Sequence, residues 1–123
     1  MLFIAKVEQT ELDASNQIDF LIEAQELNDA MNVLLQSYAI DEIKQIKEIK
    51  NISVLNSDRS IFYLATYVSN FEDKTKKVKC YISANSFSEA LTVFKDRVQY
   101  ADEIISIVKT TIQEYIYNHV NNE

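Results

Sequence analysis

The sequence of 123 residues contains no glycine, no proline and no tryptophan. Glycine allows positive φ and close backbone approach in the loops that cradle phosphates and dinucleotides, so neither loop is expected here in its usual form. Asparagine tolerates positive φ next best, and Asn16, Asn56, Asn70 and Asn85 stand at the predicted turns. Because the codons of the missing residues are GC-rich, the composition suggests an AT-rich coding sequence, from a phage, a mobile element or a low-GC bacterium.

Residues suited to catalysis are equally scarce. Histidine and cysteine occur once each, as His119 and Cys80. One cysteine excludes an internal disulfide, and one histidine with one cysteine does not make a zinc site of the usual composition. Cys80 is in phase with Val78 and Ile82, which predicts a packed, inert thiol. Since no nucleophile stands beside a base, we expect a protein that is not an enzyme and uses no cofactor and no metal.

Long apolar runs are also missing. No run approaches the roughly 20 residues that a membrane-spanning helix needs. The run Met1–Ala5 is too short, and too soon followed by charge, to be a signal peptide. We therefore expect no membrane association and a cytoplasmic location, which is the host cytoplasm if the protein is phage-encoded.

An internal repeat is the main positive feature. Shifting the sequence by 60 residues aligns Phe3–Ile40 with Tyr63–Tyr100 without a gap. Small residues match, as at Ala5 and Ala65, which indicates the same close packing in both halves. The sequence predicts a tandem β-β-α-β repeat within a single domain of residues 1–123, with repeat 1 at 1–56 and repeat 2 at 60–123.

The elements follow from residue spacing. Dense or alternating apolar residues predict strands, at Leu2–Gln9, Gln17–Ala24, Glu42–Ile49, Ile61–Ser69, Lys77–Ala84 and Glu103–Lys109. Apolar residues at helical spacing predict a helix in each repeat, one with Leu27, Ala30, Met31 and Leu34 and one with Phe87, Ala90, Leu91 and Phe94. Ser86 and Glu89 form a capping box at the start of the second helix. Thr111 and Glu114 repeat that pattern and predict a third helix.

The resulting fold class is α+β, with tandem repeats forming a mainly antiparallel sheet of about six strands, helices on one face and a C-terminal helix. Two helices cover only one face, so the other needs the C-terminal helix, a second protomer or a ligand. We expect a homodimer through that face, or through Tyr115, Ile116 and His119 of the final helix.

Charge differs between the repeats. Residues 1–56 carry four lysines and ten acidic residues, and residues 57–123 carry eight basic and nine acidic residues. We expect a non-catalytic protein-binding or assembly module whose acidic first repeat or open sheet face engages a protein partner. The candidate contacts flank the third strand of each repeat, at Asp41, Glu42, Asp102 and Glu103, where solvated turns are the alternative.

A second hypothesis is a protein that binds single-stranded nucleic acid. A basic hairpin beside strand tyrosines is typical of surfaces that bind phosphates and stack bases, and the residues concerned are Lys74, Lys76, Lys77, Lys79 and Tyr81. The net charge of −7 opposes phosphate backbones and disfavours this hypothesis.

The stretch Lys77–Ala90, KVKCYISANSFSEA, resembles the core of an uncharacterised family of small proteins from gut bacteria and their phages, domain of unknown function 4494. The run Glu103–Lys109, followed by Thr111–Glu114, is also similar to that family's last strand and following turn. The resemblance covers mainly the second half of the chain, and Ser83 stands where the family tends to be acidic. It implies a fold and no particular activity.

Overall fold

The computed structural model describes residues 1–11, 14–37, 40–71, 74–99 and 101–117. Its element order is β1 (Leu2–Glu11), β2 (Ala14–Glu23), α1 (Leu27–Ser37), β3 (Glu42–Ile49), β4 (Ile52–Val54), β5 (Phe62–Phe71), β6 (Lys74–Ser83), α2 (Phe87–Arg97), β7 (Ala101–Lys109) and β8 (Ile112–Tyr117). The protein is therefore α+β, as predicted.

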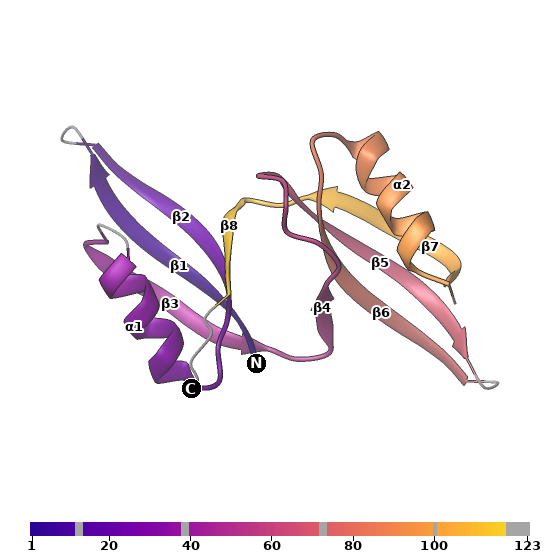
Figure 1. The fold of residues 1–123 in the computed structure, drawn as a ribbon, viewed down its shortest axis with the longest axis horizontal. Helices are drawn as coiled ribbons and strands as arrows, with labels where there is room; N and C mark the ends of the chain where they lie inside the picture. Colours follow the sequence, from indigo (N-terminus) through magenta and orange to yellow (C-terminus); the bar gives the residue numbers. More distant parts are fainter. Residues whose placement is uncertain (12–13, 38–39, 72–73, 100, 118–123) are drawn as a thin grey trace. The chain divides into compact units, whose positions relative to one another are not determined.

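The strands form two sheets, not the single sheet that was predicted (Figure 1). One has the order β3-β1-β2-β8 and the other β4-β6-β5-β7. In each sheet a long antiparallel hairpin is central and the strand that follows the helix pairs antiparallel on one side. A shorter strand, β8 or β4, pairs parallel on the other side. Both sheets are thus mainly antiparallel.

The chain divides into two compact units, whose boundaries differ from those of the predicted repeats. Unit 1 comprises Met1–Lys50 with Thr111–Glu123, and unit 2 comprises Asn51–Thr110. The chain enters unit 2 just before β4 and returns to unit 1 just before β8. β4 lies within the predicted first repeat and yet pairs with β6 of unit 2, while β8 lies within the predicted second repeat and pairs with β2 of unit 1.

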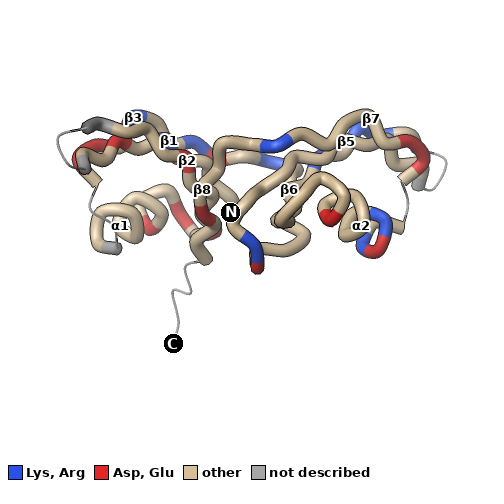
Figure 2. Tube along the Cα trace, turned by 90° about the horizontal axis from the view of Figure 1, so that it is seen from above, with Lys and Arg blue, Asp and Glu red and all other residues tan. Residues whose placement is uncertain are grey.

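Each sheet packs one face against its own helix (Figure 2). In unit 1 the strand residues Phe3, Ala5 and Val7 pack with Leu34 of α1. In unit 2 Ala65, Cys80 and Ile82 pack with Phe94 of α2, whose ring lies 5.1 Å from that of Tyr67 in an edge-to-face arrangement. The apolar faces predicted from spacing are therefore the core faces.

Apolar residues on the opposite face of each sheet are buried as well. They alternate with the core residues along the strands and include Leu2 and Leu21 in unit 1 and Phe62 and Tyr81 in unit 2. The sequence predicts that this face needs a cover, and part of it is buried within the chain.

The start of α2 confirms the predicted capping box. The Oγ of Ser86 accepts a hydrogen bond from the Glu89 amide at 3.2 Å, and a Glu89 carboxylate oxygen accepts one from the Asn85 amide at 2.9 Å. The Glu89 amide, which the helix leaves unpaired, and the amide of Asn85 just before the helix are thus satisfied. The Glu89 carboxylate reaches the residue before Ser86, and not Ser86 itself.

The predicted third helix is wrong for the residues that the structure describes, because Ile112–Tyr117 form the strand β8. The β-branched and aromatic side chains of this segment favour a strand. The edge of β2 supplies the hydrogen-bonding partner. Thr111, predicted as a helix cap, donates its hydroxyl hydrogen to the Asp19 carboxylate at 2.5 Å instead.

Positive φ falls on asparagine, but not at a predicted position. Asn51, at φ 63°, is the one residue of the described segments with positive φ. It occupies the tight connection between β3 and β4, where the chain passes from unit 1 to unit 2. Asn16, Asn56, Asn70 and Asn85, which are all described, keep negative φ.

Candidate functional site

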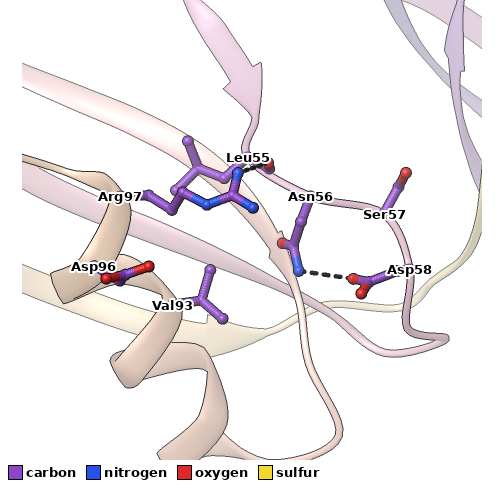
Figure 3. Close-up of a pocket in the computed structure, with 7 residues that line it drawn as sticks. All are labelled: Leu55, Asn56, Ser57, Asp58, Val93, Asp96 and Arg97. Atoms are coloured by element: carbon purple, nitrogen blue, oxygen red, sulfur yellow. Dashed lines mark hydrogen bonds between the residues drawn. The ribbon is translucent and has the colours of Figure 1, made fainter.

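A cavity of about 580 Å³ lies in unit 2 between α2 and the segment after β4 (Figure 3). Its lining comprises Leu55, Asn56, Ser57, Asp58, Val93, Asp96 and Arg97. The Arg97 guanidinium donates to the Leu55 carbonyl at 2.9 Å, and the side-chain carboxamide of Asn56 donates to the Asp58 carboxylate at 3.0 Å. The polar groups on the wall of this cavity therefore hold the segment after β4 in place.

Asn56 extends the sheet beyond the end of β4. Its carboxamide accepts from the Ser83 amide at 2.9 Å and donates to the Ser83 carbonyl at 2.9 Å, as the backbone of a parallel neighbour would. Ser83 is fully buried, and its Oγ accepts from the Arg59 amide at 3.1 Å and donates to Asp58 at 3.4 Å. The Asp58 carboxyl has a pKa below its ordinary value, chiefly because a backbone amide donates to it. Sequence reasoning missed this network, whose signal was the polar run Asn56–Ser60.

The outer strands β3 and β7 pair antiparallel with β1 and β5, and one of their bulges falls at the same place, but their side chains differ. β3 contains a bulge at Lys44, while β7 contains a bulge at Ile105 and a second one at Asp102. Beyond the bulge, Lys47 is opposite Ile4 and Val108 is opposite Leu64. β7 therefore carries aliphatic side chains at the two places where β3 carries lysines.

This difference leaves aliphatic side chains in solvent along β7. Ile104, Ile105 and Val108 are 37%, 47% and 50% exposed. Lysines on an outer strand discourage pairing with another chain. β7 lacks them at these two places, and its one lysine is Lys109 at the end of the strand. Within the described residues, no strand pairs with the outer side of β7.

A second cavity, of about 380 Å³, lies beside the start of β7. It is lined by Phe94, Lys95, Val98, Ala101, Asp102, Glu103 and Ile104. All of these come from α2, from β7 or from the segment between them, so the cavity is next to the outer edge of the sheet. Asp102 and Glu103 are exposed, and neither forms an ion pair with a described residue.

The other predicted acidic pair has different surroundings. Glu42 is 3.4 Å from the ammonium group of Lys44, which is also 3.3 Å from Glu8. These two carboxylates raise the pKa of Lys44. Asp41 donates its amide to the Glu8 carbonyl at 2.9 Å. Glu42 in unit 1 thus shares a lysine with Glu8, whereas Asp102 and Glu103 in unit 2 have no ion-pair partner among the described residues.

The lysines of the predicted basic hairpin point to both faces of the unit 2 sheet. Lys77, Lys79 and Tyr81 alternate with Lys76 along β6, so Lys76 shares the face that packs against α2. Tyr81 is only 6% exposed, and burial raises the pKa of its hydroxyl. Its ring is therefore not available for stacking on a base, while Lys74, Lys76, Lys77 and Lys79 are all exposed.

The residues predicted for a dimer interface lie in or after β8. Ile116 packs against the unit 1 core, and burial raises the pKa of Tyr115 to about 12. They are adjacent in a strand and so point to opposite faces. His119 is outside the described residues.

Among the described residues, no cluster of three or more histidine, cysteine, aspartate or glutamate side chains is arranged to hold a metal ion. None of the described helices has both the length and the apolar character needed to span a membrane. No family model, curated protein or solved structure matches the chain.

Proposed function

We propose that this chain is a protein-binding module that receives an extended segment of another polypeptide along the outer edge of β7. The observation that carries the proposal is the exposure of Ile105 and Val108 where β3 has Lys44 and Lys47. In strand addition, main-chain hydrogen bonds supply affinity and alternate side chains supply selectivity. Asp102 and Glu103, expected from the sequence to contact a partner, lie at the start of the same strand.

The backbone orientation of β7 supports this mode of binding. The Thr110 amide donates to the Phe62 carbonyl at 2.9 Å, so the backbone groups of Thr110 face β5. Orientation alternates along an antiparallel strand, which turns the amides of Ile107 and Lys109 outward. These amides are the donors that an added strand would use.

The expected affinity is modest. Covering two half-exposed aliphatic side chains contributes roughly 2–3 kcal/mol. Each added main-chain hydrogen bond contributes about 0.5–1.5 kcal/mol net, and ordering a free peptide offsets part of this gain. We therefore expect dissociation constants on the order of micromolar or weaker.

The same arrangement of both sheets supports the predicted tandem repeat as the origin of the fold. On this proposal, an ancestral unit was duplicated, and the two outer strands then diverged at the positions of Lys44 and Lys47 in β3 and of Ile105 and Val108 in β7. The function then lies in the second copy, whose outer strand has diverged.

The test is selection of nine-residue peptides from a random displayed library on the full chain, followed by titration of the synthetic peptides. The variant Ile105→Lys/Val108→Lys gives β7 the residues of β3, and it is expected to lose at least about tenfold in affinity while folding normally, because both sites are half-exposed. The matched control Asn32→Lys/Gln36→Lys adds the same charge to exposed positions of α1.

The control is expected to bind like the original chain. Methylating alternate backbone nitrogens of the peptide is expected to abolish binding, since it removes the donors of a paired strand. Failure to recover any peptide whose binding depends on Ile105 and Val108 would overturn the proposal. Equal binding by the β7 variant and the α1 control would do the same.

A further inference from the structure

The cavity beside the start of β7 combines an apolar wall with an acidic rim. Phe94, Val98, Ala101 and Ile104 supply the wall, and Asp102 and Glu103 supply two exposed carboxylates. Lys95 is the one basic residue in the lining. The lining therefore carries one net negative charge, and its acidic residues are consecutive in the outermost strand.

We infer that this cavity is a specificity site for one arginine or lysine side chain of the added strand, an inference that rests on the proposed function. Long basic side chains pack an aliphatic stem on apolar surface and keep the charged head in water. The apolar wall suits the stem, and the two carboxylates suit the head. The bulge at Asp102 interrupts the alternation that would otherwise turn the side chains of Asp102 and Glu103 to opposite faces. A guanidinium also matches carboxylate geometry better than an ammonium does, so arginine is preferred over lysine.

The contrast with unit 1 explains why the carboxylates are available. On β3, Lys44 lies within ion-pair distance of Glu42 and of Glu8. On β7 the corresponding bulge residue is Ile105, and neither Asp102 nor Glu103 has a basic partner among the described residues. An isoleucine in place of a lysine at this bulge thus leaves an aliphatic side chain at the edge and the acidic residues without an ion-pair partner.

Position along the strand makes the inference more specific. Asp102 and Glu103 are at the N-terminal end of β7. If the added strand is antiparallel to β7, its C-terminal half lies opposite that end. If it is parallel to β7, its N-terminal half lies there. The selected peptides are therefore expected to share an arginine or lysine on one side of an alternating apolar core.

The test replaces the shared arginine of a selected peptide by citrulline, which keeps the shape and removes the charge. We expect a loss of affinity of about two- to fivefold, typical of an exposed charge pair. The protein variant Asp102→Asn/Glu103→Gln is expected to show a similar loss with the arginine peptide and almost none with the citrulline peptide. A matched control, Asp96→Asn on α2, removes a carboxylate from the other cavity and is expected to change neither affinity.

Failure of the inference is distinguishable from failure of the proposed function. If arginine and citrulline peptides bind equally, and both still lose affinity to Ile105→Lys/Val108→Lys, the cation site is wrong and strand addition stands. The inference would also be overturned if the loss caused by Asp102→Asn/Glu103→Gln were the same with the arginine peptide and with the citrulline peptide. If no peptide depends on Ile105 and Val108, the proposed function fails and the inference fails with it.

Discussion

At the scale of single residues, the side chain of Asn56 forms the hydrogen bonds that the backbone of a neighbouring strand would otherwise form. Its carboxamide satisfies both the amide and the carbonyl of Ser83, which is fully buried. The sequence predicted Asn56 at a turn for its tolerance of positive φ, and the structure uses its side chain instead. This role depends on which strand end lies beside it, so the local sequence did not indicate it.

Replacing Asn56 by alanine is expected to lower the free energy of unfolding by about 2–4 kcal/mol, since two buried backbone groups of Ser83 lose their partners. Chemical denaturation monitored by circular dichroism measures the change. The neighbouring exposed substitution Ser57→Ala serves as the control and is expected to stay within about 0.5 kcal/mol of the original chain. Equal effects of the two substitutions would show that the network contributes nothing.

Cys80 is predicted to be unreactive in the folded protein. Burial raises the pKa of its thiol from 9.0 to about 11, and the side chain is 1% exposed. At pH 8 the thiolate fraction is then roughly 100-fold lower than in the unfolded chain, and alkylation by iodoacetamide slows by at least that factor. Comparison of native and denatured protein measures it, and similar rates would contradict the packing described for β6.

The same thiol links stability to alkaline pH. The folded state keeps the proton that the unfolded state releases above pH about 9, so the unfolded state binds fewer protons and stability falls as the pH rises. The stability that depends on this protonated thiol is fully present below about pH 9 and is lost as the pH approaches 11. A Cys80→Ala variant is expected to show a flatter decline over this window in thermal unfolding, and an unchanged slope would count against the shift.

At the scale of elements, β8 shows where sequence pattern was insufficient. Thr111 and Glu114 have the spacing of a capping box, while Ile112, Tyr115 and Ile116 suit a helical face and a strand alike. The choice is made by the edge of β2, with which β8 pairs. That edge is distant in the sequence, since Thr111 and its partner Asp19 are 92 residues apart. In contrast, α2 was predictable because its cap and apolar face are local.

Truncating Ile112 tests the position of β8. Its side chain is 5% exposed, so Ile112→Ala is expected to cost about 2–4 kcal/mol of unfolding free energy. The exposed neighbour in Gln113→Ala is the matched control. A cost no larger than that of the control would contradict the placement of β8 beside β2.

At the scale of the whole molecule, two units share one chain that crosses between them twice. The six predicted strands and the two repeat helices are present, but the strands form two sheets, and the unpredicted strands β4 and β8 each extend one of them in parallel. Such pairings join distant segments, so residue spacing within either segment gives no sign of them. The acidic residues Asp102 and Glu103 were predictable as candidates, whereas the exposed edge beside them became visible only once β7 was known to be outermost.

Amide hydrogen exchange measured by NMR tests strand addition most directly, with a selected peptide present at about ten times its dissociation constant. The amides of Ile107 and Lys109 face outward, and their exchange is predicted to slow about tenfold on binding, as expected for a site occupied to that extent. The amides of β3 serve as the internal comparison and are predicted to keep their rates. Unchanged exchange at Ile107 and Lys109 in the presence of bound peptide would contradict the proposal that β7 receives a strand.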